Sequence, residues 1–312
     1  MTRCNMRRNR FPGRGVLGFC RDRDMWIYLN DRFVPQEEAV VSVFDHGFLY
    51  GDGVYETLRA YRGRVFKLAD HLARLERSAS RIQLHLPAGP ERLAALVRET
   101  LARNLLEEAY LRITVSRGMG EIGLDPALCK TPTLVIIAKP FQPCPESFYA
   151  AGVPVIVAGT RRNLPEALPP QVKSLNFLNN ILAKMEAKAA GAHEALMLNH
   201  RGNVTEGTTS NVFVVQKGRL RTPSVECGIL EGISRGLVLQ LASELNIPSE
   251  EARLRIADLI HAEECFLTNT TQEVLPVTRV DGHVIGDGRP GAITRRIHAS
   301  FRACLERFLG DA

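Results

Sequence analysis

The spacing of hydrophobic residues along the chain takes two forms, which together predict a fold of mixed helices and strands. In the first half, short apolar runs separated by turn residues such as Asn30-Asp31 and Arg62-Gly63 are typical of antiparallel strands. Other stretches repeat apolar residues at helical spacing, as a helix with one buried face requires. The expected strands are 26–34 (a hairpin), 40–44, 54–61, 65–68, 110–116 and 133–138, and the expected helices are 68–82 and 93–105. The first half is therefore predicted to be α+β.

A proline-rich stretch divides this pattern from a second one. Prolines interrupt regular structure within residues 140–150, so this segment is predicted to link a small N-terminal α/β domain (25–139) to a larger C-terminal domain (151–312). Beyond the linker, the expected strands are 153–158, 194–199, 203–206, 211–216, 264–268 and 273–280, and the expected helices are 174–190, 230–245, 256–262 and 293–308. The chain of 312 residues is long enough for two such domains of mixed α/β structure.

Charge is concentrated at one end of the chain, which bears on possible partners. The formal net charge is +6, and residues 1–24 contribute +5 of it through seven arginines and two aspartates. A nucleic-acid-binding face would instead be a basic stripe with interleaved aromatic residues on the folded body, which is close to neutral. Residues 1–24 are therefore predicted to be a disordered basic extension, and no nucleic-acid partner is expected.

Composition and cysteine spacing exclude several further classes of protein. With 45% hydrophobic and 24% charged residues, the chain is typical of a folded globular protein. No apolar run approaches the roughly 18–20 residues that a membrane-spanning helix needs. The 7 cysteines are scattered without a C-x-x-C pair, so neither a zinc site nor a disulfide framework is indicated. We expect reduced thiols, no metal, no membrane partner and a cytoplasmic location.

Two ionisable residues stand at positions where chemistry is possible. Lys173 lies at the junction of a polar loop and the helix expected at 174–190, where its amine can project into a cleft or simply into solvent. Glu206 ends a strand before the small-residue loop 207–211, which lets a backbone approach a ligand closely. Taken alone, such a lysine is more often a solvated charge, and such a glutamate is more often a capping or surface acid.

Two further features could bind an anion. Arg74 lies on the helix expected at 68–82, on a different face from its leucines, where a single arginine is normally a surface residue. The segment Gly228-Ile-Leu-Glu-Gly-Ile-Ser-Arg235 precedes the helix expected at 237–245, so free N–H groups there form an anion site. Such a helix start can equally be capped by Ser234 and bind nothing.

Several motifs occur in a fixed order along the chain. They are Tyr50-Gly-Asp-Gly-Val-Tyr-Glu-Thr-Leu-Arg59, Val172-Lys-Ser-Leu-Asn-Phe-Leu-Asn-Asn-Ile-Leu-Ala-Lys184 and Asn203-Val-Thr-Glu-Gly-Thr-Thr-Ser-Asn-Val-Phe213, with further segments at 71–75, 194–199, 232–235 and 268–276. Together they closely resemble the class IV aminotransferases, which are pyridoxal-phosphate (PLP) enzymes of fold type IV. The resemblance covers residues 26–312 and implies a two-domain fold, similar to that of D-amino acid aminotransferases, with the cofactor between the domains.

The resemblance implies a role for each candidate residue. Lys173 would be the Schiff-base lysine, and Glu206 would face the pyridine nitrogen of PLP and keep the ring protonated. Arg74 would bind the phosphate together with the helix start, because a guanidinium and free N–H groups suit a dianion. The implied cofactor-binding set is Arg74, Lys173, Glu206, Ile233, Ser234 and Thr270, with Lys173 as the catalytic residue.

Within this class, the substrate-facing positions favour the branched-chain aminotransferases. Tyr50, Tyr55 and Arg59 occupy the tyrosine, aromatic and arginine positions of those enzymes, and Tyr110-Leu-Arg112 fits their Tyr-x-Arg. Arg59 would meet the distal carboxylate of glutamate, and backbone N–H groups of a turn would receive the substrate carboxylate. The implied substrate-binding set is Tyr50, Tyr55, Arg59, Tyr110, Thr270 and Thr271.

The expected reaction is transfer of the amino group of L-leucine, L-isoleucine or L-valine to 2-oxoglutarate, carried out by a homodimer or larger homo-oligomer. Three alternatives stay open. The sequence Val54-Tyr55-Glu56 is more similar to that of the D-amino acid transaminases. Those enzymes usually bind the substrate carboxylate with an Arg-x-His motif, however, and residues 119–128 lack this motif. An aminodeoxychorismate lyase would share the same cofactor contacts, and a protein of this fold could also bind a ligand without turnover.

Overall fold

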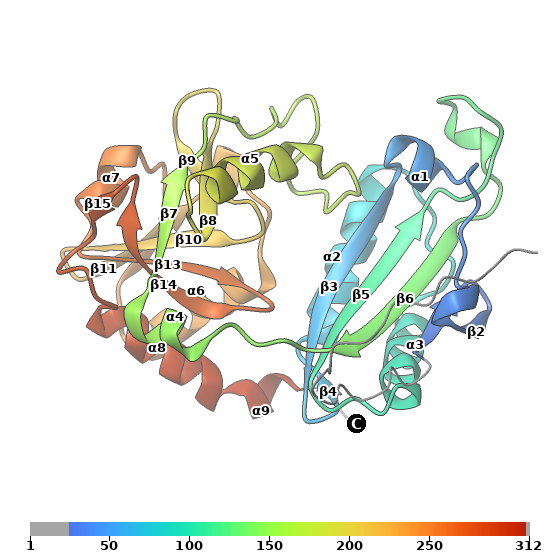
Figure 1. Ribbon diagram of the computed structural model, residues 1–312, viewed down its shortest axis with the longest axis horizontal. Coiled ribbons are helices and arrows are strands. Elements are labelled where there is room, and N and C mark those ends of the chain that lie inside the picture. The colour runs from blue at the N-terminus through green and yellow to red at the C-terminus, as the bar shows by residue number, and fades with distance from the viewer. Residues whose placement is uncertain (1–24, 310–312) are drawn as a thin grey trace, which may run out of the picture.

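The molecule is built from two sheets with helices packed against them, arranged as two lobes side by side (Figure 1). The computed structural model describes residues 25–309, so the basic segment 1–24, for which we predicted disorder, lies outside the described residues. We call residues 25–140 the first lobe and residues 146–309 the second lobe.

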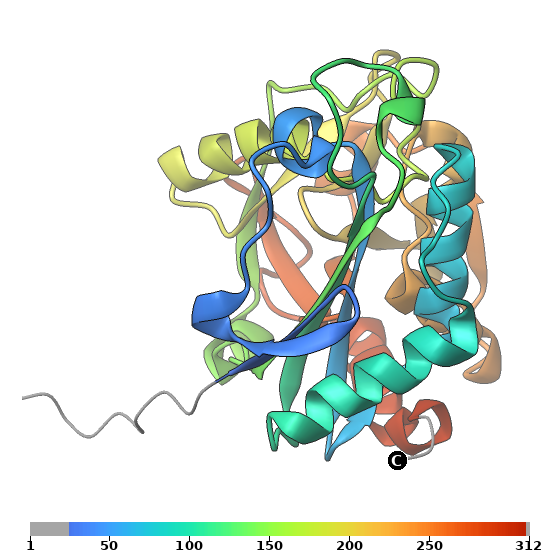
Figure 2. The same cartoon turned by 90° about the vertical axis from the view of Figure 1, so that its right-hand side faces the viewer.

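The first lobe contains a six-stranded antiparallel sheet in the order β2-β1-β6-β5-β3-β4. Its strands are β1 (Trp26–Leu29), β2 (Arg32–Pro35), β3 (Gly53–Tyr61), β4 (Arg64–Val65), β5 (Ala109–Ser116) and β6 (Thr133–Pro140). Two amphipathic helices, α2 (Leu68–Arg81) and α3 (Pro90–Arg103), pack against the sheet, as the view from the side of this lobe shows (Figure 2).

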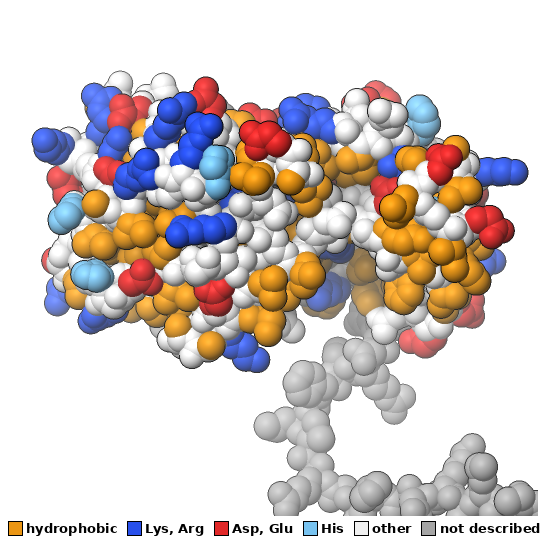
Figure 3. Space-filling view, turned by 90° about the horizontal axis from the view of Figure 1, so that it is seen from above, with side chains coloured by type: hydrophobic (Ala, Val, Ile, Leu, Met, Phe, Trp, Pro, Cys, Tyr) orange, Lys and Arg blue, Asp and Glu red, His pale blue; other side chains and the backbone are white. Residues whose placement is uncertain are grey.

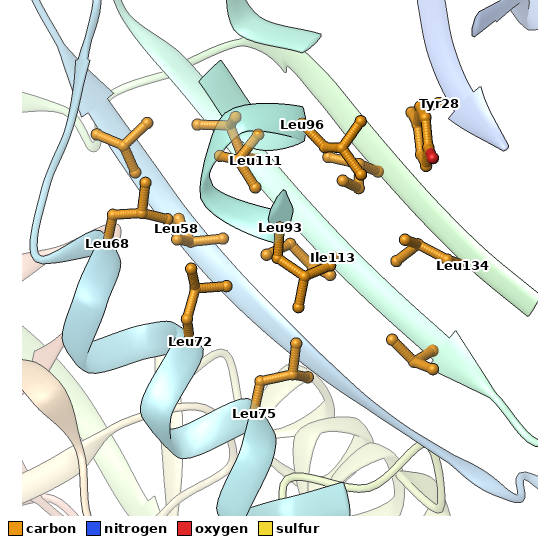
Figure 4. Packing of buried hydrophobic residues seen from close by; sticks show 14 of the residues in the cluster. Tyr28, Leu58, Leu68, Leu72, Leu75, Leu93, Leu96, Leu111, Ile113 and Leu134 are labelled. Carbon is orange, nitrogen blue, oxygen red and sulfur yellow. The ribbon is translucent and has the colours of Figure 1, made fainter. Parts of the chain in front are cut away.

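Alternation along the strands divides the first sheet into a core face and a cavity face. Successive side chains of a strand point to opposite faces, so Leu58 of β3 points toward the helices while its neighbours Thr57 and Arg59 point away from them. The leucines of α2 repeat at helical spacing and meet this core face (Figure 4). The buried contacts join Leu58, Leu111 and Ile113 of the sheet to Leu72, Leu75 and Leu93 of the helices.

The second lobe contains a nine-stranded mixed sheet in the order β12-β11-β10-β13-β14-β7-β8-β9, with β15 paired to β14. Strand β7 runs parallel to both β14 and β8, and β11 runs parallel to β12. The strands are β7 (Val153–Val157), β8 (Glu194–Leu198), β9 (Val204–Gly207), β10 (Asn211–Gln216), β11 (Arg219–Pro223), β12 (Ser249–Ala252), β13 (Glu264–Asn269), β14 (Glu273–Val280) and β15 (His283–Val284).

Helices cover the second sheet on more than one side. The helices are α4 (Glu146–Ala151), α5 (Leu178–Ala189), α6 (Ile233–Glu244), α7 (Ile256–Ile260), α8 (Ala292–Ala303) and α9 (Leu305–Phe308). Helices α6 and α8 pack on each other and on β13, whereas α5 packs on β8 through small residues such as Ala183 and Ala187. None of the helices within residues 25–309 is long and apolar enough to cross a membrane.

Several predicted elements differ from the structure. Residues 40–44 do not form a strand, and α1 (His46–Tyr50) follows them because Asp45 caps it by accepting the Gly47 N–H. The helix predicted at 174–190 begins only at Leu178, since the residues before it pair with β3. The helix predicted at 293–308 is divided into α8 and α9 at Cys304.

The connection between the lobes is more structured than predicted. Helix α4 lies almost entirely within residues 140–150, which we expected to be a linker. The C-terminal end also returns to the first lobe, where Leu309 forms a bridge with Phe66 and the Phe308 carbonyl accepts the Lys67 N–H at 2.9 Å. The division into two domains therefore remains a prediction, although each lobe has its own sheet.

Candidate active site

A cavity of about 350 Å³ lies between the two lobes. Its walls come from β3, α2 and β5 of the first lobe and from segments 206–211, 232–234 and 268–271 of the second lobe, with residues 173–177 between them. The predicted site residues that line this cavity are Tyr55, Arg74, Tyr110, Lys173, Glu206, Ile233, Ser234, Thr270 and Thr271. The fold thus gathers segments that are far apart in the sequence.

Lys173 is held by pairing with β3, not by the helix start that we predicted for it. The Lys173 carbonyl accepts the Tyr55 N–H at 3.0 Å, and the Lys173 N–H donates to Oγ of Ser78 at 3.2 Å. The next residue, Ser174, forms a bridge with Val54. The Lys173 amine lies 4.5 Å from the centre of the Tyr55 ring. Pairing with β3 therefore directs the amine into the cavity.

The surroundings of Lys173 favour its neutral form. Burial, and next the positive charge of Arg74, lower the pKa of Lys173 to about 8, whereas Glu56 and Glu206 act in the opposite direction. Only an unprotonated amine can attack a carbonyl. With this pKa, about a tenth of the amine is unprotonated at pH 7, far more than for an ordinary lysine.

Glu206, on β9, forms the second-lobe wall of the cavity and is buried with its carboxylate paired. Arg162 donates to Oε1 of Glu206 from Nε at 3.0 Å and from Nη2 at 2.9 Å. The Leu230 N–H donates to Oε2 at 3.0 Å. Burial raises the pKa of Glu206, while the charge and hydrogen bonds of Arg162 act to lower it. Arg162 therefore favours the ionised form, which can present a negative charge to a ring nitrogen. Arg162 was not among the residues that the sequence indicated, because nothing in its local sequence distinguishes it.

Arg74 is buried because β3 offers it a carboxylate. Arg74 donates to Oε1 of Glu56 from Nε at 2.7 Å and to Oε2 from Nη2 at 2.8 Å, and its Nη1 donates to the Glu231 carbonyl at 2.9 Å. His71 Nδ1 lies 2.8 Å from the same Oε2. Although burial acts to raise it, Arg74 and His71 hold the pKa of Glu56 at about 2. The ionised Glu56 thus fixes the guanidinium at the cavity wall.

The N-terminus of α6 provides an anion site beside Arg74. Its cap residue, Gly232, gives no side chain to the first N–H groups, and a Cβ at this position would collide with Oδ1 of Asn211. Oγ of Ser234 and Oγ1 of Thr268 are buried and have no hydrogen-bond partner within residues 25–309. Free N–H groups at a helix start attract anions, and the two hydroxyls can add further donors. Thr268 was not among the residues that the sequence indicated.

Thr270 and Thr271 lie in the turn between β13 and β14, at the edge of the cavity. Oδ1 of Asn269 accepts the N–H groups of Thr271 at 3.0 Å and of Gln272 at 2.7 Å. The Thr271 hydroxyl donates to the same oxygen at 3.1 Å. The Thr271 N–H, which we expected to bind substrate, therefore already has an acceptor, so a substrate carboxylate would have to share it with Asn269.

Aromatic and apolar side chains form another part of the wall. The rings of Tyr55 and Phe177 meet edge to face with centroids 5.9 Å apart, and Leu175 and Tyr110 lie in the same lining. The Arg112 guanidinium lies over the Tyr55 ring, 3.9 Å from its centroid. This wall can accept an apolar side chain next to one positive charge.

Two predicted substrate residues do not line the cavity. Arg59 donates from Nη1 to Oε1 of Glu273 at 2.9 Å and lies between the rings of Tyr61 and Phe141. Its charge is therefore already paired outside the cavity, and its role toward the distal carboxylate of glutamate stays a prediction. Arg112 is the guanidinium that enters the cavity in its place. The motif Tyr110-Leu-Arg112 contains this arginine, but the substrate-binding set expected from the sequence did not include it.

Tyr50, the second of these residues, is the last residue of α1 and is partly buried. Its hydroxyl accepts the Gly123 N–H at 3.1 Å, and its ring packs edge to face on His46. Tyr50 therefore does not line the cavity of its own chain, and its contact with substrate stays a prediction.

The residues around the cavity fit PLP. An amine with a lowered pKa suits an aldehyde, and a buried carboxylate suits a pyridine nitrogen. The hydroxyls of Ser234 and Thr268, which have no partner within residues 25–309, suit a phosphate dianion together with Arg74 and the uncapped start of α6. Three separate groups of the cofactor thus each find a complementary partner.

Residues 53–280 match the family model of the class IV amino-transferases, and the chain belongs to this family. It is accordingly a PLP-dependent aminotransferase of fold type IV. The resemblance inferred from the sequence motifs is confirmed.

Relatives within the family carry two different names. The chain is 45% identical over 278 residues, covering 89% of this chain and 96% of the relative, to a protein of Methanocaldococcus jannaschii named "Putative branched-chain-amino-acid aminotransferase". It is 36% identical over 278 residues to the D-alanine aminotransferase of Bacillus licheniformis, covering 89% and 96% of the two chains. The structure of the branched-chain aminotransferase of Thermoproteus uzoniensis with norvaline matches with a TM-score of 0.85 and 37% identity, covering 90% of this chain and 94% of that one.

Trace labelling with acetic anhydride can measure the titration of Lys173 in the cofactor-free protein. We expect labelling of Lys173 to rise with pH around a midpoint near 8, because burial and Arg74 lower its pKa. Arg74→Met should move the midpoint upward, since it removes the neighbouring positive charge. A midpoint near the ordinary lysine value of about 10.4 in the unsubstituted protein would show that the cavity does not favour the neutral amine.

Proposed function

We propose that the protein is a branched-chain-amino-acid transaminase that moves the amino group of L-leucine, L-isoleucine or L-valine to 2-oxoglutarate. The observation that carries this proposal is the composition of the cavity wall. An apolar surface formed by Tyr55, Leu175 and Phe177 meets the Arg112 guanidinium close to Lys173. Such a wall suits both partners of the reaction, because a branched aliphatic side chain needs the apolar surface and the distal carboxylate of glutamate needs the cation.

Lys173 and its neighbours would each have a separate role in cofactor binding or proton transfer. PLP, when bound, draws electrons from the substrate and weakens its Cα–H bond. Arg74, Ser234 and the start of α6 would hold the phosphate, and Glu206 would hold the pyridine nitrogen. Nζ of Lys173 would take the Cα proton of the amino acid and later return a proton in the reverse half of the reaction. The lowered pKa of Lys173 suits this role, because the amine must be free to accept a proton.

The D-amino acid transaminases are the second candidate, since the chain is also 36% identical to a D-alanine aminotransferase. Against this candidate, residues 119–128 contain no Arg-x-His. A panel of L- and D-amino acids with 2-oxoglutarate separates the two candidates. We expect turnover of L-leucine, L-isoleucine and L-valine, and turnover of D-alanine alone would contradict the proposal.

Two substitutions test the assigned roles of the central residues. Lys173→Ala should abolish turnover, because no other lysine within residues 25–309 lines the cavity. Glu206→Gln should keep bound PLP but lose most activity, since an amide cannot hold a positive charge on the ring nitrogen. Turnover of L-leucine with 2-oxoglutarate and the visible spectrum of bound PLP would be measured for both. Full activity of Lys173→Ala, or an unchanged rate in Glu206→Gln, would refute these roles.

Arg112→Met tests the source of specificity for the second substrate. We expect the KM for 2-oxoglutarate to rise about tenfold or more, because the distal carboxylate loses its cation, while the KM for L-leucine changes less than about threefold. Arg112→Lys keeps the charge and should recover part of the affinity. Steady-state kinetics with each substrate varied in turn gives both constants, and an equal rise in the two would argue against a distal-carboxylate role.

We also propose that the protein forms a homodimer through an apolar face that carries α1 and α5. Large hydrophobic side chains are exposed in segments 40–48 and 119–124 and along α5, and Figure 3 shows hydrophobic side chains gathered in the view from above. The two segments lie together, since the Gly120 N–H donates to the Phe44 carbonyl, and Asn176 links α5 to α1 through the Gly51 carbonyl. Exposed apolar side chains on one face favour association, and a contact through this face would bring Tyr50 of each chain near the partner.

Ile181→Glu on α5 tests this assembly. Ile181 is 49% exposed, and a charge at this position should weaken a contact between apolar faces. Light scattering coupled to gel filtration should show twice the mass of one chain for the unsubstituted protein and a shift toward a single chain for the variant. Val284→Glu, at a 46% exposed position on β15, is the matched control and should leave the mass unchanged. A monomer in the unsubstituted protein would rule out the dimer.

A further inference from the structure

The turn that borders the cavity ends at a buried and conformationally unusual acid. Glu273 is the first residue of β14 and pairs with Asn269 across the turn. Its φ is 56°, in the left-handed region that non-glycine residues seldom adopt and that persists only when the surroundings fix it. The side chain is 2% exposed. Contacts of the Glu273 carboxylate therefore bear directly on the shape of the Thr270–Gln272 turn.

Both oxygens of this carboxylate are fully occupied. Oε1 accepts from Nη1 of Arg59 at 2.9 Å and from the Tyr61 hydroxyl at 3.1 Å. Oε2 accepts from Nε of Arg302 at 2.9 Å, and Nε2 of His298 lies 3.0 Å from it. Although burial acts to raise it, the hydrogen bonds of His298 and Arg302 and the charges of Arg302 and Arg59 hold the pKa of Glu273 at about 2. The carboxylate is an ionised hub between the two lobes.

The first-lobe residues that bind the Glu273 carboxylate, Arg59 and Tyr61, lie on β3, which also forms part of the cavity wall. Every second side chain of β3 points to the same face of the sheet, and on the cavity face these are Tyr55, Thr57, Arg59 and Tyr61. The first two line the cavity, and the last two hold Glu273. The Arg59 guanidinium is fixed between the Tyr61 and Phe141 rings, at 4.0 Å and 3.9 Å from their centroids. A rigid strand thus connects the pocket wall to the end of the turn.

We propose that Arg59, Tyr61 and Glu273 form an inter-lobe clasp that positions the Thr270–Gln272 turn to receive the α-carboxylate of every substrate. The inference rests on the proposed function and on the expectation, drawn from the sequence, that this turn receives the substrate carboxylate. Arg59 and Glu273 are then positioning residues that act through the turn and touch no substrate. Because amino acids and 2-oxo acids share the α-carboxylate, loosening the clasp weakens binding of both, unlike a change at Arg112.

Glu273→Gln and Arg59→Met test the clasp in the PLP-loaded enzyme. We expect the KM for L-leucine and the KM for 2-oxoglutarate to rise together by about tenfold, with kcat changed less than about threefold, because binding in the ground state and transition state is lost alike. Affinity for PLP should stay within about threefold, since the phosphate site is elsewhere. Calorimetry with 4-methylvalerate, a leucine-shaped carboxylate without the amine, should show binding weakened by the same factor of about ten.

Two further variants keep the test decisive. Tyr61→Phe removes one donor to Oε1 without changing the shape of the side chain, and it should raise both KM values about threefold even if Arg59→Met fails to fold. Arg221→Met breaks a different set of ion pairs, with Glu250 and Asp258, and Arg221 lies on β11 near the other edge of the second sheet. This control should lower the unfolding temperature without changing either KM.

The outcomes separate the clasp from the proposed function. If the unsubstituted enzyme transaminates and the clasp variants lose thermal stability with unchanged KM values, the ion pair is merely structural and the clasp is refuted while the proposed function stands. A rise in the KM for 2-oxoglutarate alone would also refute the clasp, because that result would mean that Arg59 contacts the distal carboxylate. If the unsubstituted enzyme turns over no amino acid with 2-oxoglutarate, the proposed function and the clasp both fail.

Discussion

The amine of Lys173 lies between two buried ion pairs, and the remainder of the site depends on the balance of charge among them. Glu56 with Arg74 stands on the first-lobe side, and Glu206 with Arg162 stands on the second-lobe side. A buried charge is costly unless it is paired, so each carboxylate and guanidinium has a fixed partner. The Lys173 amine forms no such ion pair within residues 25–309, and burial can therefore shift it toward its neutral form.

Strand β3 supplies the geometry that this charge balance needs. Its alternation places Glu56 on the helix side, where it holds Arg74, and places Tyr55 on the cavity side. The backbone of the same strand pairs with Lys173. Further along the cavity face, Arg59 reaches Glu273 of the second lobe. One strand thus positions Lys173, Arg74 and the inter-lobe contact, so a small displacement of β3 would affect all three.

The sequence predicted the classes of element and most of the cavity lining, because hydrophobic periodicity and local motifs are short-range signals. Lys173 and Glu206 could be identified since each belongs to a continuous motif. Arg162, Thr268 and the pairing of Arg59 could not, because they depend on which segments meet across the two lobes. The boundary of α5 was wrong for the same reason, as long-range pairing with β3 overrides helical periodicity before Leu178.

The most direct test of this account is a half-reaction in which the PLP-loaded protein is mixed with one amino acid and no oxo acid. L-leucine and D-alanine are added in separate cuvettes, and the visible absorption band of the bound cofactor is followed. The account predicts that L-leucine removes the band, that 2-oxoglutarate restores it, and that D-alanine leaves it unchanged. The account is contradicted if D-alanine alone removes the band, or if neither amino acid removes it.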